Sequence, residues 1–224
     1  MLERNRVVTF DAFCDELWDG EPPRTAVATV RTHVYHLRRV LRRADAGRGA
    51  RVADRIVTRA AAYTLAVDGD EVDAHVFGAL VAEGATALAA GRDEEAARIL
   101  RRALGMWHGD ALANVRPGRV LTPHAVALEE TRNRARELRI EADLRLGRHR
   151  ELIAELRGLT AAHPLNEWLR ARLADALHRA GRRHEALAAL GEARDLLDAE
   201  LGLRPSEELR CLQRDIITGR QESS

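Results

Sequence analysis

Arginine recurs along residues 29–43, a stretch that reads TVRTHVYHLRRVLRR and holds five arginines and two histidines. A guanidinium group presents planar, paired N–H donors, and this geometry suits a phosphate or the edge of a guanine base. Apolar residues recur in the same stretch at the spacing of one helix face: Val30, Val34, Leu37 and Leu41. The pattern predicts a helix with one apolar side and one strongly basic side.

The basic side holds the candidate nucleic-acid contacts, because a recognition helix packs one side on its own domain and turns the other to the major groove. We expect base edges or nearby phosphates to be contacted by Arg31, Thr32, Tyr35 and His36. Bidentate pairing with phosphates is expected of Arg38, Arg39, Arg42 and Arg43. Groups at the helix start and on a neighbouring hairpin complete the set, namely Thr25, Thr29 and Arg59.

The flanking sequence predicts the elements that would position this helix. Residues 6–20 read as a short strand and then a helix, with Thr9 as its N-cap and Gly20 as its end. The segment EPPRT, residues 21–25, is a turn because its two prolines block helix. Two β-prone runs within residues 56–67 predict a hairpin. The order helix, turn, helix, hairpin is that of a winged helix.

From about residue 72 the pattern becomes helical and repetitive. Gly-Arg turns recur along it, and Gly147 and Gly181 lie 34 residues apart, the period of tetratricopeptide helix pairs. An irregular insertion at 106–124 interrupts the pattern. The predicted fold is mainly α: a winged helix-turn-helix with a β-hairpin wing and a shortened N-terminus at 1–68, then a tetratricopeptide-like helical domain at 72–220.

Charge is concentrated at the N-terminal end. The net formal charge is +1, yet residues 1–67 carry 12 arginines against 8 acidic residues, a net of +4, so the remainder is acidic. The chain contains no lysine, which excludes a lysine-dependent phosphate loop and Schiff-base chemistry. No apolar run reaches membrane-spanning length, and no signal peptide opens the chain. We therefore expect a cytoplasmic protein without a membrane partner.

Metal and catalytic motifs are missing from the sequence. His33 and His36 lie one helical turn apart but lack further ligands, and Cys14 and Cys211 lie far apart. No nucleophile motif and no metalloprotease motif is present. We expect no metal, no cofactor and no enzymatic activity, and we interpret Trp107 as a core anchor between helices.

Several segments together resemble a known family. They are NRVVTFDAFCDELW, PPRTAVATVRTHVYHLRRVL, IVTRAAAYTL, EVDAHVFGALVAEG, LGMWHGDAL and LLDAELGLRPSEELRCL. In order and kind they resemble the Streptomyces antibiotic regulatory protein family, a response-regulator-type winged helix followed by a bacterial transcriptional activation domain. Two features depart from that family. Only five residues stand where a helix and a small sheet precede the first strand, and alanines at 60–62 replace the glycine before the wing tyrosine.

The resemblance implies a transcriptional activator of antibiotic biosynthesis genes. It would bind direct repeats in promoter DNA and help RNA polymerase engage, through the sigma factor or the alpha subunit, as a monomer or a homodimer on tandem repeats. Two alternatives stay open. The chain could be a protein-interaction adaptor or antagonist that has lost DNA binding through N-terminal truncation. It could also be a repressor that senses a small molecule in a pocket formed by the 106–124 insertion.

Overall fold

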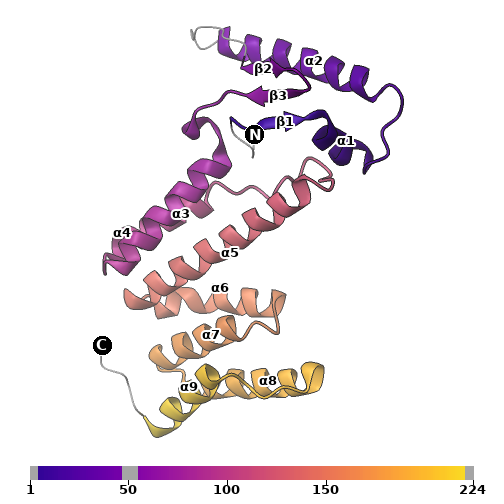
Figure 1. Cartoon of the computed structure of the whole chain (residues 1–224). Coiled ribbons are helices and arrows are strands. Elements are labelled where there is room, and N and C mark those ends of the chain that lie inside the picture. The colour runs from indigo at the N-terminus through magenta and orange to yellow at the C-terminus, as the bar shows by residue number, and fades with distance from the viewer. Residues whose placement is uncertain (1–4, 47–54, 220–224) are drawn as a thin grey trace. The chain divides into compact units, whose positions relative to one another are not determined.

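The computed structural model describes residues 5–46 and 55–219, which form a mainly α-helical fold with one small sheet (Figure 1). The segment ADAGRGAR, residues 44–51, is expected to form a loop after the arginine-rich helix, and part of it lies outside the described residues. None of the described helices is long and apolar enough to cross a bilayer. Over the same ranges, no cluster of three histidine, cysteine or acidic side chains is arranged as a metal site.

The described chain divides into two compact units. Residues up to 87, together with 98–137, form the first unit, and residues 88–97, together with 138–219, form the second. The first unit therefore contains more than the N-terminal segment that the sequence pattern separates at residues 68–72. Several helices of the second half contribute their ends to it.

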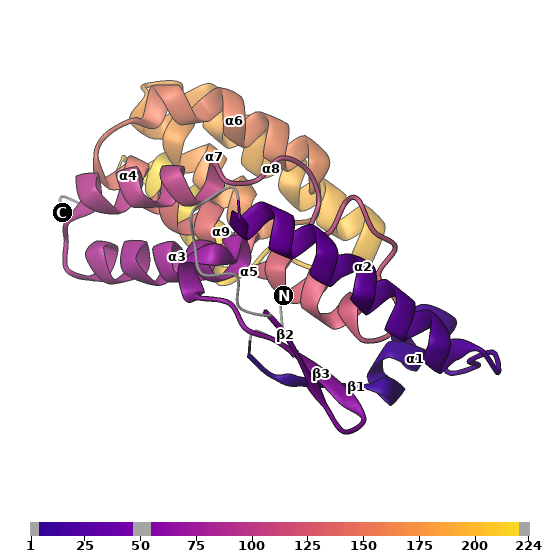
Figure 2. The ribbon, with the colours of Figure 1, turned by 90° about the horizontal axis from the view of Figure 1, so that it is seen from above.

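The N-terminal part of the first unit is a helix–turn–helix followed by a hairpin. Its elements are β1 (Val7–Thr9), α1 (Phe10–Trp18), α2 (Ala26–Ala46), β2 (Ile56–Arg59) and β3 (Ala62–Leu65). The strands form an antiparallel sheet in the order β1-β3-β2. Figures 1 and 2 show this sheet alongside α2. The helix ends at Ala46, three residues beyond the arginine-rich stretch at 29–43.

Local chemistry accounts for the ends of these elements. The Thr9 hydroxyl accepts the Ala12 N–H at 3.3 Å and so caps α1. The helix ends where Asp19 and then Gly20 adopt positive φ of 54° and 85°. The β2–β3 hairpin turns through residues 60–61, and none of the three alanines at 60–62 has a positive φ. The alanines in place of glycine therefore impose no backbone strain.

The core beneath α2 is small and mixed aromatic and aliphatic. Val30 and Val34 are buried against Ile56 of β2 and Tyr63 of β3. The aromatic rings of Phe10, Phe13 and Trp18 and the side chains of Leu41 and Leu65 pack around this centre. These contacts confirm the predicted apolar side of the arginine-rich helix for Val30, Val34 and Leu41.

Leu37, however, was expected in the buried stripe, and this expectation is wrong. Its side chain is 53% exposed, and the neighbouring Val40 is 61% exposed. Both lie on the flank of α2 away from the sheet, and no other described element covers that flank. Arg38 instead occupies the half-buried position that faces β2.

The rest of the first unit contains one short helix and parts of three longer helices that also contribute residues to the second unit. It contains η1 (Gly69–Glu71) and parts of α3 (Asp73–Ala89), α4 (Asp93–Leu104) and α5 (Leu121–Arg145). Helices α3 and α4 approach so closely that a Cβ on Gly84 would lie 2.6 Å from the Leu100 side chain. The three acidic residues that open α4 occupy its first turn, where the helix dipole favours them.

One carboxylate connects α1 to the start of α5. The Glu16 side chain accepts N–H bonds from Gly118 at 2.7 Å, Val120 at 2.9 Å and Leu121 at 2.9 Å. These N–H groups have no partner within α5 itself, because they precede or open its first turn. A Cβ on Gly118 would lie 2.3 Å from the Glu16 carbonyl oxygen. The approach therefore requires glycine at this position, although Gly118 has an ordinary φ.

The second unit repeats a helix–turn–helix pattern through α6 (His149–Ala162), α7 (Glu167–Arg179), α8 (Arg183–Leu201) and α9 (Glu207–Thr218). Gly147 and Gly181 adopt φ of 75° and 80° at equivalent helix ends. The residue after each glycine donates its N–H to a carbonyl five positions back, at 3.0 Å for Arg148 and 2.8 Å for Arg182. Both ends are Schellman caps, which explains why the Gly-Arg turn repeats at this spacing.

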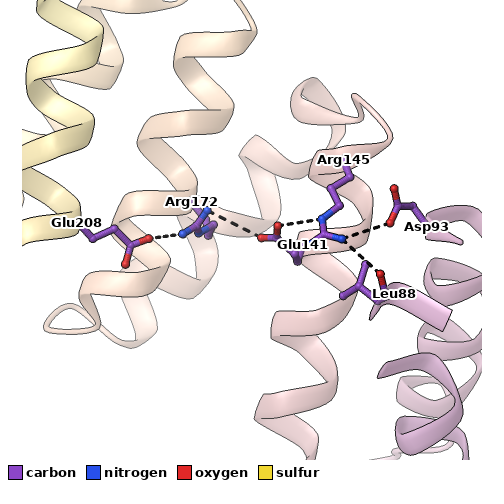
Figure 3. Close-up of polar contacts among 6 residues, drawn as sticks. All are labelled: Leu88, Asp93, Glu141, Arg145, Arg172 and Glu208. Atoms are coloured by element: carbon purple, nitrogen blue, oxygen red, sulfur yellow. Dashed lines mark hydrogen bonds and ion pairs between the residues drawn. The ribbon is translucent and has the colours of Figure 1, made fainter. Parts of the chain in front are cut away.

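A network of hydrogen bonds and ion pairs connects helices within the second unit (Figure 3). Its members are Leu88, Asp93, Glu141, Arg145, Arg172 and Glu208. Arg145 donates to the Leu88 carbonyl at 3.4 Å and to Glu141 at 3.2 Å, and it lies 3.7 Å from Asp93. Arg172 joins Glu141 to Glu208. This network links the end of α3, which contains Leu88, with α4, α5, α7 and α9.

Replacing Glu16 by alanine removes the acceptor for three N–H groups at the start of α5. We expect the free energy of unfolding to fall by about 1–3 kcal/mol, the usual cost of stranding part-buried donors. Urea denaturation followed by circular dichroism measures the change. Glu130→Gln is the control, because Glu130 is an exposed carboxylate on α5, and it should leave the unfolding curve unchanged. A loss no larger for Glu16→Ala than for this control would contradict the capping role.

His149 predicts a pH dependence of stability. Burial, assisted by the nearby positive charge of Arg179 and opposed by Asp175, lowers the pKa of His149 below its ordinary value. The unfolded chain therefore binds more protons at this position as the pH falls through about 6.5, and the folded form loses stability on acidification. We expect His149→Asn to lose less stability than the parent chain between about pH 7.5 and pH 5. Denaturation curves at the two pH values test this, and parallel losses would contradict it.

Candidate nucleic-acid interface

The exposed side of α2 carries most of the residues expected to contact nucleic acid. The exposed members are Arg31, Thr32, Tyr35, His36, Arg39, Arg42 and Arg43. At 100° per residue they lie opposite Val30 and Val34, and Arg39 lies at the centre of the exposed arc. The sequence pattern thus placed the two sides of the helix correctly along this arc.

This side of α2 carries an excess of arginine, and Asp45, near the end of the helix, is the acidic residue of the helix. Residues 26–44 of α2 contain no aspartate or glutamate. From Arg31 to Arg43 the exposed guanidinium groups extend over about 18 Å, at 1.5 Å per residue. Duplex DNA carries one negative charge per about 1.7 Å of its axis, so a helix of this length lies near several phosphates at once.

Arg38 differs from the other arginines of α2. Its Nε and Nη2 donate to the Ile56 carbonyl at 3.2 Å and 2.7 Å, and Nη2 also donates to the Thr58 hydroxyl at 2.8 Å. The guanidinium carbon lies 6.0 Å from the centre of the Tyr63 ring. Arg38 therefore connects α2 to the hairpin, and its expected role in phosphate pairing stays a prediction with few donors left to serve it.

The remaining candidates lie around the same helix. The Thr32 hydroxyl donates to the Ala28 carbonyl at 3.0 Å, which leaves its lone pairs available. Tyr35 is 62% exposed, and its ring meets the His36 ring edge-on with centres 5.6 Å apart. Both rings extend from the helix as a polar, aromatic pair next to the arginines.

The three remaining candidate contacts lie at the start of α2 and on the β2–β3 hairpin. Thr25 is exposed, and its carbonyl accepts the Thr29 N–H at 2.9 Å, while Thr29 is half-buried. Arg59 is exposed at the end of β2, directly before the hairpin turn and opposite Ala62. The hairpin thus carries one guanidinium group at its tip, outside the basic arc of α2.

The sequence pattern did not identify Glu16 as a residue that supports the candidate interface. It lies on the half-buried side of α1 and supports the region through a contact with residues more than 100 positions away. No local pattern marks such a residue, because a glutamate on a short helix is ordinary. The only sequence signal is the glycine that it approaches, within an insertion of irregular composition.

Comparison with known proteins places the whole chain in a family. The bacterial transcriptional activator domain family matches residues 72–217. The chain is 40% identical to the regulatory protein DnrI of Streptomyces peucetius, over 96% of this chain and 80% of that protein. It is 37% identical to the regulatory protein AfsR of Streptomyces griseus, over 99% of this chain but 22% of AfsR.

A solved structure agrees with the sequence comparison. The structure titled "Mycobacterium tuberculosis EmbR in complex with low affinity phosphopeptide" aligns with a TM-score of 0.89 at 33% identity, covering 98% of this chain and 57% of that one. The chain thus spans most of DnrI but only about half of EmbR and a fifth of AfsR. On the family match and this similarity, the chain belongs to the Streptomyces antibiotic regulatory protein family of transcriptional activators.

Proposed function

We propose that the chain binds promoter DNA, with residues 5–68 acting as a winged helix and α2 as its recognition helix. The observation that carries this proposal is the basic arc of α2, which contains no acidic residue and lies opposite a buried side. Insertion of such a helix into the major groove brings the central guanidinium groups close to phosphates on both sides. The hairpin then carries Arg59 toward the neighbouring backbone or minor groove.

Within this arrangement the side chains of α2 divide by position. Arg31, Thr32, Tyr35 and His36 lie in the first half of the helix, which in recognition helices is the part that contacts base edges. Arg39, Arg42 and Arg43 lie in the second half and pair with phosphates. Base contacts determine which sequence is bound, whereas phosphate contacts determine the affinity and its dependence on salt.

Residues 72–217 then form the activating part, a tetratricopeptide-like stack that presents a helical surface to RNA polymerase. The proposal rests on the family matched at these residues and on the repeated Schellman-capped turns of the second unit. The proposed targets are direct repeats in promoters of antibiotic biosynthesis genes. Regulatory proteins of Streptomyces are among the similar proteins, as is the transcriptional regulator RedD at 33% identity.

An adaptor without DNA binding is the second candidate. The exposed Leu37 and Val40 favour it, because uncovered apolar residues beside the basic arc are typical of a surface that another protein segment covers. A titration of promoter DNA with the full chain, followed by fluorescence anisotropy, separates the two candidates. A complex at low salt supports DNA binding, whereas no complex with any segment of the neighbouring promoter supports the adaptor.

Arg39→Ala tests the basic arc directly. We expect weaker binding, and a slope of log affinity against log salt that is smaller by about 1, because one phosphate contact is lost. Arg98→Ala serves as the matched control, since Arg98 is an exposed arginine on α4, and its slope should equal that of the parent chain. Equal slopes for Arg39→Ala and the parent would remove Arg39 from the interface.

Arg38→Ala should behave differently from Arg39→Ala. Loss of the bonds to Ile56 and Thr58 strands a carbonyl of the hairpin, so we expect the free energy of unfolding to fall by about 1–2 kcal/mol. Faster amide hydrogen exchange in β2 and β3 should accompany this loss. If Arg38→Ala keeps the parent's stability and exchange rates but reduces the salt slope, Arg38 is a phosphate contact and the connecting role is wrong.

A further inference from the structure

A pocket of about 350 Å³ opens within the first unit, between the start of α3 and the segment that follows α4. Its apolar lining comes from Phe77, Met106, Trp107, Leu112 and Leu128. Pockets of this size and composition are the ones in which proteins bind small organic molecules. The pocket lies apart from α2 and belongs to none of the proposed DNA contacts.

Two aromatic rings form one wall of the pocket. The Trp107 ring meets the Phe77 ring edge-on, with centres 5.3 Å apart and an interplanar angle of 80°. The Arg132 guanidinium lies 4.5 Å from the centre of the Trp107 ring and fixes it further. Trp107 is therefore held in place by α3 and α5 yet remains only half-buried, and part of its ring lines the pocket.

The polar lining is acidic. Asp73 and Asp110 both line the pocket, together with His108 and Asn114, and no arginine is among its lining residues. Asp73 accepts the Ala74 N–H at 2.8 Å, but within the described ranges neither aspartate takes part in an ion pair. Arg132, which lies against Trp107, is paired with Glu129 at 3.4 Å. Asp73 and Asp110 are therefore the charged side chains of the lining itself, and they favour a positively charged ligand.

The segment around the pocket is held in one conformation. Glu129 accepts the Ala111 N–H at 2.7 Å, and Arg132 donates to the Gly109 carbonyl at 3.2 Å. Leu112 directly follows these anchored residues and adopts a φ of 58°, a conformation that a leucine rarely takes. Strained residues of this kind persist where the surroundings enforce them, and they cluster at binding sites. The pocket is therefore preformed rather than a gap in a loose loop.

We infer that this pocket binds a small organic cation with a flat, apolar body, such as an aromatic or alicyclic amine. The apolar body lies against Trp107, Phe77 and Leu128, and the ammonium group lies near Asp73 and Asp110. Charge complementarity selects the cation, and the aromatic wall selects a flat shape. The inference stands independently of DNA binding, because no residue of α2 takes part in it.

Three matched probes test the inference on the full chain: naphthylethylamine, naphthylethanol and naphthylacetate, which share one ring system and differ in charge. Ligand-observed NMR and calorimetry should show the amine binding with a dissociation constant of about 0.1–1 mM, as suits a ligand of this size. We expect the alcohol to bind about three- to tenfold more weakly, and the acid more weakly still.

Asp110→Asn removes one charge at an exposed position without changing side-chain size. It should weaken amine binding about three- to tenfold and leave alcohol binding unchanged. Asp198→Asn, an exposed aspartate on α8, is the matched control and should change neither. Circular dichroism confirms that both variants keep the parent's fold. Equal binding of all three probes, no binding of the amine at about 5 mM, or amine binding unaffected by Asp110→Asn would each overturn the inference.

Discussion

The three N–H bonds accepted by Glu16 are the constraint on which the arrangement of the first unit depends. A carboxylate satisfies donors at the start of α5 that the helix itself leaves unpaired, and it does so from α1. Helix α1, which packs beside α2, is thereby fixed to the start of α5. Gly118 permits the approach, since any larger residue would collide with the Glu16 backbone. A residue outside the basic arc of α2 thus determines how α1 is held.

Residues 109–121 are held by hydrogen bonds near both ends of the segment. At one end, Glu129 and Arg132 hold residues 109–111 beside the pocket. At the other end, Glu16 holds residues 118–121. This continuous backbone joins the pocket lining to the Glu16 contact on α1 within the first unit.

Local rules account for the parts of the fold that the sequence predicted. The strand–helix start at 7–18, the β2–β3 hairpin and the Schellman turns at Gly147 and Gly181 each depend on residues within a few positions of one another. Such features leave a periodic or turn signal in the sequence. The Glu16 contacts depend on partners far along the chain, and for that reason no local pattern predicted them. A pocket was one hypothesis for the 106–124 insertion, but the sequence did not predict its lining from α3 and α5. The composition of the 106–124 insertion indicated irregular structure there but not its contacts.

Leu37 and Arg38 show how a correct helix prediction can still misplace side chains. Helical periodicity assumes that a helix buries a stripe centred on its apolar residues, but what is buried depends on what packs against it. Here the sheet packs on one flank only, so Arg38, with its long apolar stem and hydrogen-bonding head, occupies the half-buried position, while Leu37 stays exposed. Counting arginines in the sequence therefore overstates the positive charge that α2 presents to solvent. The guanidinium group of Arg38 stabilises the hairpin, whereas Arg39, at the centre of the exposed arc, faces solvent.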